Sequence, residues 1–533
     1  MSNLERPQLF ENIKIKKVKH NQATRQLELF LEMSPERLSI SSGITTQLSK
    51  ILNFFDRLSY LPGPWWAKFT SFPYMLQRVL GESDRFSSKL HKEYGQVVRV
   101  GPNEVSISNT RDLKIILSSY RYPKSQAYTN TEPRQSNIFT TRSEEMNRVR
   151  RRQIAPAFSK EGLASVEDLV MKVGILSLKK KIDTEIKLGN GKYVANYYKL
   201  FQNLTSDVIS ELAFGKSFNA IQNDGNEVID WVHSVIIISS LKAIFPFVSY
   251  FPLVLNKLEE EKRNLIYHNF DAIENRRALM DSGKYKQSRK DILHMYLTSV
   301  NSDGKKLSYY EIISESIFML VAGIDTTSVS MTWLLHFYTI YPEVYKKVLD
   351  EIDANFPDRT TPITYDQVCE KLKYFIATVY ECLRMKPPVN GSLPRDSSSD
   401  GVQLSSCYIP KDVHLLLYTE GAHRNKHIWT DPEKFIPERF MGEGEKLKKE
   451  LFAFSSGVRI CPGRNLGLME IYTVMTNLLR DYDFKLLPGS FYGPDNLDPS
   501  RGNEPYILKD KTLLTRIPIN DGMECNIIVT HRQ

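Results

Sequence analysis

The chain has 533 residues, of which 41% are hydrophobic and 25% are charged, so it can bury a large core and does not have the composition of a disordered protein. Its net charge of +9 is modest for this length, and it has no arginine-rich tract with interleaved aromatic residues, which argues against nucleic-acid binding. The five cysteines are odd in number, widely spaced and without a Cys-x-x-Cys pair, which disfavours a disulfide framework or a zinc site and indicates a reducing compartment.

The N-terminal part of the chain, residues 1–60, is predicted to be an extension that precedes one large domain, residues 61–533. Apolar residues recur at helical spacing in the segment 44–61, which predicts an amphipathic helix that either packs on the protein or lies in a membrane interface. No signal peptide is evident, and no apolar run reaches the roughly 18–20 residues of a membrane-spanning helix. The prolines of LPGPWW at 61–66 predict a stiff turn where the compact domain begins.

The segments that follow are mostly helical. The alternating, glycine-flanked sequence at 95–108 predicts a β-hairpin, and most segments between 143 and 390 have helical periodicity. The clearest helix starts at a capping box formed by Ser308 and Glu311 and is closed by Pro342. At roughly 1.5 Å per residue it would span about 45 Å, and because it is apolar on nearly every side it should pass through the centre of the fold.

Two more helices and a terminal hairpin complete the predicted fold. One helix spans 368–386 and ends at two prolines, a last helix spans 464–482, and the tail from Thr512 onward has the pattern of a hairpin. We therefore predict a mainly α fold with a small β portion, organised as a single large domain around a long central helix.

The cysteine in the sequence FAFSSGVRICPGRNLG has an unusual setting. Cys461 precedes the predicted N-terminus of the last helix, where backbone N–H groups and the helix dipole favour a thiolate. Gly457, Gly463 and Gly467 remove side-chain bulk around it, and Arg459 adds a cation two residues away. A thiolate in such a pocket can act as a nucleophile or as a metal ligand, whereas the alternative is a structural cysteine in a tight turn.

The central helix contains a polar notch, AGIDTT at 322–327. Gly323 costs about 1 kcal/mol against alanine in a helix interior, and Asp325 costs more on a core face unless it has a partner or a function. Thr326 and Thr327 can bond back to carbonyl groups one turn earlier and loosen the helix. The notch is either a locally bent helix with solvated polar groups or an acid and an alcohol that deliver protons to a site.

Two shorter motifs are ordinary on their own. ECLR places Glu381 and Arg384 three residues apart on one helix face, and FIPERF adds Arg439 in an irregular segment. The chain also lacks a Gly-x-Gly-x-x-Gly sequence after a strand and a phosphate-binding loop, so no nicotinamide or flavin site is predicted. Electrons for any redox chemistry would have to come from another protein.

AGIDTT, ECLR, FIPERF and FSSGVRICPG, in this order, resemble the cytochrome P450 superfamily of haem-thiolate monooxygenases. The last sequence matches the family signature Phe-x-x-Gly-x-Arg-x-Cys-x-Gly at every fixed position, namely Phe454, Gly457, Arg459, Cys461 and Gly463. The resemblance covers residues 61–533. LPGPWW, the APAFS after an arginine cluster, and the tail are similar to the fungal members that oxidise secondary metabolites.

The resemblance implies a role for each motif. Asp325 and Thr326 would be the acid–alcohol pair at the oxygen site. The cofactor-binding residues would be Cys461, which ligates the iron of haem b, and, around the porphyrin and its propionates, Arg459, Arg395, Arg151, Phe454, Gly457 and Gly463. A buried structural triad behind the haem would consist of Glu381, Arg384 and Arg439. The family often has Trp or His four residues before the arginine matched by Arg151, whereas Asn147 stands at that position here.

The resemblance also implies the reaction and the partners. The enzyme would insert one atom of O2 into a lipophilic small molecule, a secondary metabolite such as a terpenoid, with electrons from NADPH-cytochrome P450 reductase. Candidate substrate-lining segments are 136–141, 241–253, 318–322 and 389–393. The alternatives are a haem-thiolate isomerase or dehydratase that needs no reductase, and a non-enzymatic haem sensor or carrier.

The same resemblance implies a location at the cytosolic face of the endoplasmic reticulum membrane. Because no spanning helix is evident, we expect contact with the membrane surface through the helix at 44–61 and through the apolar, aromatic-rich segment 241–255. The alternative for the second segment is burial in the core of the domain.

Overall fold

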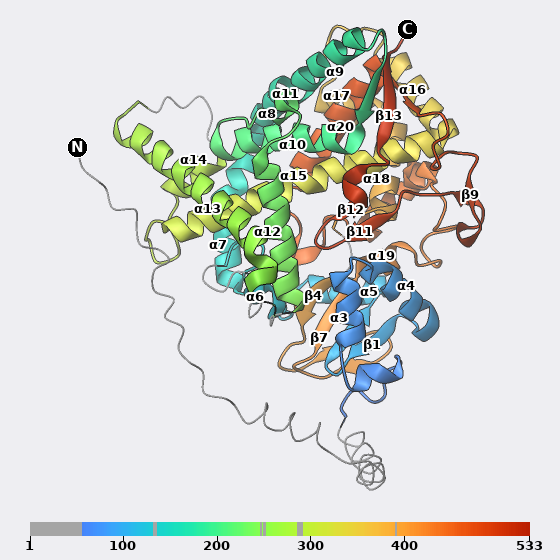
Figure 1. Ribbon diagram of the computed structural model, residues 1–533. Coiled ribbons are helices and arrows are strands. Elements are labelled where there is room, and N and C mark those ends of the chain that lie inside the picture. Colours follow the sequence, from blue (N-terminus) through green and yellow to red (C-terminus); the bar gives the residue numbers. More distant parts are fainter. Residues whose placement is uncertain (1–55, 132–135, 246–247, 249–251, 285–290, 390–391) are drawn as a thin grey trace. The chain divides into compact units, whose positions relative to one another are not determined.

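The computed structural model describes residues 56–131, 136–245, 248, 252–284, 291–389 and 392–533. The chain divides after Tyr60, and Leu61–Gln533 form one compact unit, which is the domain described below (Figure 1). Most of the predicted amphipathic helix at 44–61, and part of the segment 241–255, lie outside the described residues.

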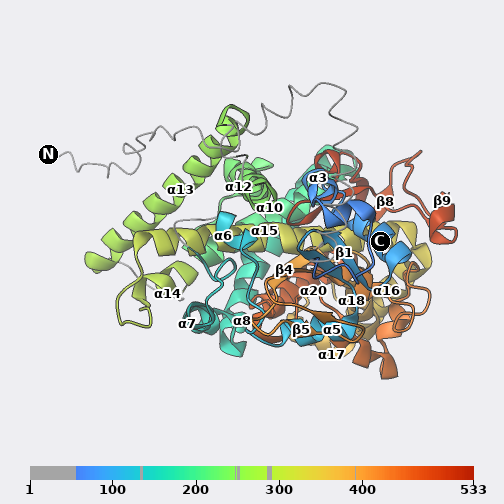
Figure 2. The ribbon, with the colours of Figure 1, turned by 90° about the horizontal axis from the view of Figure 1, so that it is seen from below.

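A single long helix, α15 (Tyr309–Ile340), runs through the middle of the domain, as the sequence predicts (Figure 1, Figure 2). It begins at the predicted capping box, in which the Ser308 hydroxyl accepts from the Glu311 N–H and the Glu311 carboxylate accepts from the Ser308 N–H at 2.8 Å. Every residue from 327 to 338 is buried. Within the described part of the chain, α15 is also the one helix long and apolar enough to span a membrane, but its burial is that of a core helix.

Helices pack on both sides of α15. On one side lie α10 (Tyr197–Phe214), α12 (Glu227–Ile244) and α13 (Pro252–Asp281), and on the other lie α18 (Lys373–Met385) and α20 (Arg464–Asp481) (Figure 2). Gly323 allows the close approach of α10, because a Cβ at this position would collide with the side chain of Ile209. The glycine of the polar notch is therefore required for helix packing.

Other helices surround this group, and the fold is mainly α as predicted. Those before α15 are η1 (Trp65–Lys68), α3 (Phe72–Val79), α4 (Ser83–Tyr94), α5 (Thr110–Leu117), α6 (Ala127–Thr131), α7 (Glu144–Ile154), η2 (Ala155–Phe158), α8 (Lys160–Leu169), η3 (Val170–Leu176), α9 (Ser177–Leu188), α11 (Ala220–Asn223) and α14 (Ile292–Thr298). Those after it are α16 (Pro342–Asn355), α17 (Tyr365–Lys371), α19 (Thr419–His423), η5 (Pro437–Phe440), η6 (Gly442–Glu450), η7 (Gly457–Arg459), η8 (Pro499–Arg501) and η9 (Asn520–Gly522).

The predicted helix at 368–386 is divided in two, so this prediction is wrong. α17 and α18 meet at Leu372, which has φ −105° and ψ 65° and is not helical. The Glu351 carboxylate, on α16, accepts from the N–H groups of Tyr374 and Phe375 at 2.8 Å each. These bonds cap the start of α18 from another helix, which is why the backbone breaks although the apolar periodicity continues.

The β portion is small. The larger sheet has the strand order β1 (Val97–Gly101), β2 (Glu104–Ile107), β7 (His414–Tyr418), β4 (Ser392–Asp396); β2 and β7 are parallel and the other pairs antiparallel, and β1–β2 is the predicted hairpin. A second sheet has the order β3 (Tyr193–Asn196), β13 (Asn526–His531), β8 (Tyr482–Leu486). The short antiparallel pairs are β5 (Val402–Gln403) with β6 (Tyr408–Ile409), β9 (Leu497–Asp498) with β10 (Glu504–Pro505), and β11 (Asp510–Thr512) with β12 (Arg516–Pro518).

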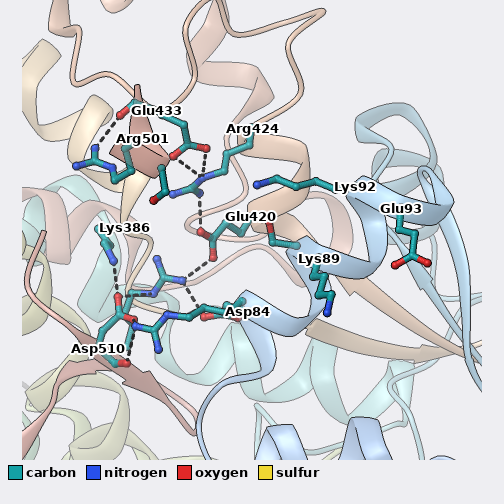
Figure 3. Close-up of a pocket in the computed structure, with 14 residues that line it drawn as sticks. Asp84, Lys89, Lys92, Glu93, Lys386, Glu420, Arg424, Glu433, Arg501 and Asp510 are labelled. Atoms are coloured by element: carbon teal, nitrogen blue, oxygen red, sulfur yellow. Dashed lines mark hydrogen bonds and ion pairs between the residues drawn. The ribbon is translucent and has the colours of Figure 1, made fainter. Parts of the chain in front are cut away.

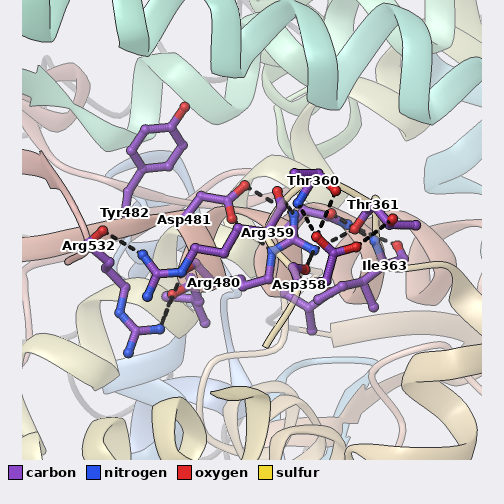
Figure 4. A network of polar contacts seen from close by, with 12 residues as sticks. Asp358, Arg359, Thr360, Thr361, Ile363, Arg480, Asp481, Tyr482 and Arg532 are labelled. Atoms are coloured by element: carbon purple, nitrogen blue, oxygen red, sulfur yellow. Dashed lines mark hydrogen bonds and ion pairs between the residues drawn. The ribbon is translucent and has the colours of Figure 1, made fainter. Parts of the chain in front are cut away.

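The C-terminal tail does not form the predicted terminal hairpin. β12 pairs backward with β11, whereas β13 pairs with β3 and β8. β12 has three residues and η9 separates it from β13, so it does not offer a matching edge to the longer strand. The tail is instead held by polar contacts: the Arg359 guanidinium donates to the Arg532 carbonyl (Figure 4) and to the Gln533 carbonyl, and Arg532 pairs with Asp353 at 2.6 Å.

The surface of η1 and α3 exposes large apolar side chains that the sequence pattern did not predict. We call these residues the N-terminal apolar patch: between 41% and 78% of each side chain is exposed in Trp65, Phe69, Phe72, Leu76 and Leu80. Large apolar side chains left exposed on two consecutive elements are typical of contact sites for a membrane or another protein.

Candidate active site

The Cys461 loop connects η7 to α20 and is closed by the Cys461 N–H, which donates to the Phe454 carbonyl at 2.9 Å. Gly457 has φ +64°, and a Cβ there would collide with the carbonyl group of Leu117 at the end of α5. A Cβ at Gly463 would lie 3.9 Å from the Cys461 sulfur and from the Phe158 ring, which is an ordinary van der Waals distance. Contacts within the chain therefore require a glycine at 457 but not at 463.

The Cys461 side chain is accessible, whereas those of Cys382 and Cys525 are buried. The surrounding protein nevertheless raises the pKa of the Cys461 thiol, mainly through burial, while the Gly463 N–H and the charge of Arg151 oppose this shift. The helix N-terminus thus favours the thiolate, as expected, but burial outweighs it. The protein alone therefore favours the neutral thiol more than water does, and a bound metal ion would stabilise the thiolate.

One face of α15 is partly accessible midway along the buried helix. We call it the accessible stripe; it consists of Ser314, Phe318, Ala322 and Thr326, spaced four residues apart. The Thr326 hydroxyl donates to the Ala322 carbonyl at 2.6 Å, which is the backbone bond that the sequence predicts. Phe318 stacks on Phe139 with ring centroids 4.8 Å apart, so the predicted lining segment 136–141 lies beside this stripe.

Asp325 lies on a different face of α15 from Thr326. It is 1% exposed and lies among α10, α12 and the loop before β12. Its Oδ1 is 3.1 Å from His233 Nε2 and 3.4 Å from Gln202 Nε2, and its Oδ2 accepts from the Thr515 hydroxyl at 3.3 Å. The structure therefore separates the predicted acid from the predicted alcohol: Thr326 borders the accessible stripe, and Asp325 is bonded to the protein side.

Four cationic side chains converge near the Cys461 loop. We call this set the cation cluster; its members are Lys124, Arg151, Arg395 and Arg459. Lys124 and Arg395 form a β-bridge between their backbones, and Arg151 donates to the Ile460 carbonyl at 2.7 Å, directly beside Cys461. No ion pair to any of the four occurs among the residues that the structure describes.

Burial without a carboxylate partner perturbs these groups. Lys124 is 6% exposed, and burial, together with the charges of Arg395 and Arg459, lowers the pKa of its ammonium group well below the usual value. Its Nζ contacts the Phe139 carbonyl and lies 3.7 Å from the centroid of the Phe139 ring. Burial also lowers the pKa of Arg395, and it lowers that of Arg459 to about 10. Arg459 Nη1 is buried without a hydrogen-bond partner in the described structure.

Glu381, Arg384 and Arg439 form a compact buried group, in which both arginines bond the same carboxylate. Arg384 Nε and Nη2 each donate to Glu381 at 2.8 Å, and Arg439 Nε donates to Glu381 at 3.1 Å. Arg384 donates further to the carbonyl groups of His423, Pro432 and Lys434. Every charge in this group is thus neutralised or hydrogen-bonded within the chain.

Comparison with known proteins identifies the family. The family model described as Cytochrome P450 matches residues 60–502. Two cytochrome P450 monooxygenases of Aspergillus fumigatus, helB2 and helB1, are each 30% identical over 90% of this chain and over 95% and 83% of their own length. The cytochrome P450 monooxygenase FUS8 of Gibberella fujikuroi is 28% identical over 82% of this chain and 85% of its own. The chain belongs to the cytochrome P450 family.

This P450 is therefore an oxidoreductase that incorporates oxygen from O2, and its family implies a haem-thiolate cofactor, a redox partner and a small-molecule substrate. The residues present fit such a cofactor. The accessible cysteine can supply the thiolate, the glycine at 463 is not required by the chain itself, and the cation cluster can receive carboxylates.

A cavity of about 630 Å³ lies elsewhere in this P450, between α4, α19 and the β11–β12 pair (Figure 3). All its lining residues are polar or charged. At its base Arg516 pairs with Asp84 at 2.7 Å and with Glu420, and Lys386 pairs with Asp510. A cleft of this composition does not suit a lipophilic substrate.

Two further polar residues, Lys124 and Asn147, lie near the site. Lys124 was missed, because a single lysine in YPKS carries no signal until the fold places it beside Arg395. Asn147, which replaces the aromatic or imidazole side chain of the family pattern, is buried; it accepts from the Tyr120 hydroxyl at 3.0 Å and donates to the Ile138 carbonyl at 3.1 Å. Its polar atoms are therefore used within the chain.

Proposed function

We propose that Cys461 ligates the iron of haem b, with the porphyrin between the Cys461 loop and the accessible stripe of α15. The accessible thiol and the absence of a side chain at Gly463 support this position. Phe454 and Gly457 would shape the loop around the sulfur, since the Phe454 carbonyl accepts the Cys461 N–H and Gly457 seats the loop against α5.

The observation that carries the proposal is the cation cluster. A buried cation without a partner costs several kcal/mol, and such groups are kept when a bound anion neutralises them. Haem b carries two propionate groups, so Arg459, Arg395 and Arg151 would bind them, and we add Lys124 to this set. The buried, unbonded Nη1 of Arg459 and the strongly lowered pKa of Lys124 both indicate where anionic oxygens belong.

The bound haem-thiolate would supply the oxidising chemistry that transfers one atom of O2 to the substrate. On the protein side, Thr326 would present its hydroxyl to the site from the accessible stripe, where it can hold an ordered water in place. Asp325 would hold and release the protons that this chemistry consumes. Glu381, Arg384 and Arg439 would keep the packing behind the haem fixed.

The substrate is proposed to be a lipophilic secondary metabolite such as a terpenoid. Phe139, Phe318 and Ala322 give the stripe an apolar surface, and Ser314 adds one hydroxyl group that can anchor a polar substituent. Asn137 Nδ2 donates to the Ser314 hydroxyl at 3.3 Å, which fixes the direction of this group.

NADPH-cytochrome P450 reductase is proposed as the redox partner, and the endoplasmic reticulum membrane, at its cytosolic face, as the location. The N-terminal apolar patch supports membrane contact, because its aromatic side chains on η1 and α3 are suited to the membrane interface. The contacts expected at 44–61 and 241–255 stay predictions, since much of both segments lies outside the described residues.

The test is coexpression with the reductase, followed by screening of terpenoid, polyketide and fatty-acid compounds for type I spectral shifts and oxidised products. We expect the red-shifted Soret band of a thiolate-ligated ferrous–CO complex, and product that requires both NADPH and the reductase. Product formed without the reductase would instead indicate an isomerase or dehydratase, and binding without any turnover would indicate a sensor or carrier.

A further inference from the structure

The predicted lining segment 136–141 contains a turn that is closed by its own hydrogen bonds. The Asn137 side-chain oxygen accepts from the N–H groups of Phe139 and Thr140, at 3.0 and 2.9 Å. The Asn137 carbonyl accepts from the Thr141 N–H at 2.9 Å. Because these bonds fix the turn internally, its orientation in the protein depends on the bonds that it makes to other elements.

Both polar backbone groups of Ile138, in the middle of this turn, bond to side chains of two different helices. Glu315 Oε1, on α15, accepts from the Ile138 N–H at 2.9 Å, and Asn147 Nδ2, on α7, donates to the Ile138 carbonyl at 3.1 Å. All three residues are buried. Loss of either bond would therefore leave a buried backbone group of the closed turn without this partner.

Glu315 and Asn147 are themselves held in place. Arg150 Nε pairs with Glu315 Oε1 at 3.0 Å, and the Tyr296 hydroxyl donates to Glu315 Oε2 at 3.4 Å. The Tyr120 hydroxyl donates to Asn147 Oδ1 at 3.0 Å. Burial raises the pKa of the Glu315 carboxyl to about 7 although Arg150 opposes this shift. An acid is thus costly at this buried position, which favours a specific use for it.

Phe139, the next residue in the turn, lies against the accessible stripe. Its ring stacks on that of Phe318, with centroids 4.8 Å apart and planes inclined by 11°. Its carbonyl accepts from Lys124 Nζ. Because the backbone of Ile138 is bonded on both sides, the Phe139 ring is held at one position beside the stripe.

We infer that Glu315 and Asn147 are positioning residues that determine which substrates fit the site. They act through the backbone of Ile138, which holds the Phe139 ring as a wall beside the accessible stripe. Such a wall favours substrates with a ring that can pack on an aromatic face. The inference rests on the proposed position of the haem and substrate beside the stripe, and it adds the residues that set the shape of that space.

The first test measures the hold on the turn and needs neither substrate nor turnover. Amide hydrogen exchange of the full-length haem protein is followed by mass spectrometry on the peptide that covers 136–141. We expect Glu315→Leu and Asn147→Leu each to speed exchange in this peptide about tenfold, because each leaves one backbone group of Ile138 without this partner. Glu315→Gln should exchange like the wild type, since its carbonyl oxygen can accept from the same N–H.

The second test asks whether this hold sets the shape of the site. Imidazole and 4-phenylimidazole are the probes, because both bind haem iron through an imidazole nitrogen and they differ by one aromatic ring. Spectral titrations give the two dissociation constants for each variant. Their ratio measures how well the site accepts the ring, and a general loss of stability that weakens both probes alike leaves this ratio unchanged.

We expect Glu315→Leu and Phe139→Ala each to lower the preference for 4-phenylimidazole about fivefold. The double variant should lower it no further than Phe139→Ala, because Glu315 acts through the Phe139 ring. Asn147→Leu should match Glu315→Leu, and it carries both tests if Glu315→Leu does not fold. Thr378→Val, which removes a buried hydrogen bond between α15 and α18, is the matched control and should behave as the wild type in both tests.

The possible outcomes separate this inference from the proposed function. Absence of the red-shifted ferrous–CO band in the wild type would overturn the proposed function, and the inference with it. With the band present, unchanged exchange in Glu315→Leu and Asn147→Leu would overturn the inference alone. Faster exchange with an unchanged ratio would show that the turn does not border the site, and effects of Glu315→Leu and Phe139→Ala that multiply would show that Glu315 acts by another route. Either result would also overturn the inference.

Discussion

Two groups of buried or half-buried arginines in this protein differ in how their charge is neutralised. Behind the Cys461 loop, Arg384 donates two bonds to Glu381 and three to backbone carbonyl groups, so all its charge is satisfied within the chain. In the cation cluster, Arg395 and Arg459 have no carboxylate partner among the described residues, and burial lowers the pKa of both. One region is electrostatically complete, and the other requires an anion from outside the chain.

The difference indicates which charges serve stability and which serve a ligand. A buried charge that the chain neutralises fixes the packing around it, whereas a buried charge that the chain leaves unpaired lowers stability until a ligand binds. Charged residues near a site can therefore be sorted by counting their partners.

The largest effect is expected at Cys461, whose loop lies beside the cation cluster. Cys461→Ala should abolish the red-shifted Soret band of the ferrous–CO complex, because no other cysteine has this setting. The measurement is the CO difference spectrum of the purified protein. Cys407→Ala, which changes another partly accessible cysteine, is the control and should keep the band. A normal band in Cys461→Ala would contradict the assignment of the ligand.

Substitution in the group formed by Glu381, Arg384 and Arg439 should lower the stability of the protein. Glu381→Gln leaves Arg384 and Arg439 with an uncompensated buried charge, so the free energy of unfolding should fall by about 3–5 kcal/mol. Urea unfolding of the haem protein measures this change. Glu144→Gln removes a surface carboxylate that pairs with Arg148 and should change the same quantity by less than about 1 kcal/mol. An equal loss of unfolding free energy in Glu381→Gln and Glu144→Gln would show that the buried group contributes no more to stability than a surface ion pair.

Substitution in the cation cluster should instead raise the stability of the haem-free protein. Lys124→Met removes an unpaired buried charge, so the haem-free protein should gain about 1–3 kcal/mol in free energy of unfolding, while haem affinity falls about tenfold. Unfolding and haem-transfer measurements test the two parts. Lys446→Met, at an exposed lysine, is the control. A loss of stability in haem-free Lys124→Met would show that the chain itself neutralises Lys124.

Lys124 should also make the free energy of unfolding of the haem-free protein depend on pH. Because burial lowers the pKa of Lys124 in the folded protein, the unfolded chain binds more protons between that lowered value and the ordinary lysine pKa of 10.5. The free energy of unfolding of the haem-free protein should therefore rise with pH across this window, and Lys124→Met should flatten that rise.

Substitutions of Thr326 and Asp325, on two faces of α15, should leave haem binding intact and change only turnover. Thr326→Ala, on the accessible stripe, should still bind haem and consume NADPH but release hydrogen peroxide, with the ratio of product to NADPH lowered about tenfold. Asp325→Asn, on the protein side, should slow turnover instead. Thr327→Ala, at a buried position beside Gly467, is the control for Thr326. An unchanged ratio in Thr326→Ala would contradict the acid–alcohol role.

The smallest effect on the enzyme itself is expected at the N-terminal apolar patch, whose proposed partner is also outside the chain. The double substitution Phe69→Ser/Phe72→Ser should reduce the fraction that pellets with membranes and leave the CO spectrum unchanged. Leu188→Ser, which changes an exposed apolar residue on α9, should leave the pelleted fraction unchanged. Full retention of the double variant in the membrane fraction would assign attachment to another segment.

The amino-acid sequence by itself determined the features that depend on neighbouring residues. The capping box at Ser308 and Glu311 sets the start of α15, the glycine-flanked alternation gives the β1–β2 hairpin, and the spacing around Cys461 identifies the family. Each of these depends on local backbone preference or on a short run of side chains, which one sequence contains in full.

The tertiary structure decided the features that depend on residues far apart in the chain. Glu351 breaks the predicted helix before α18, β13 takes β3 and β8 as partners, and Lys124 joins the cation cluster through its bridge to Arg395. It also separates Asp325 from Thr326, although they are consecutive, because a step of one residue turns about 100° around a helix and only the packing of α10 and α12 determines which face is buried.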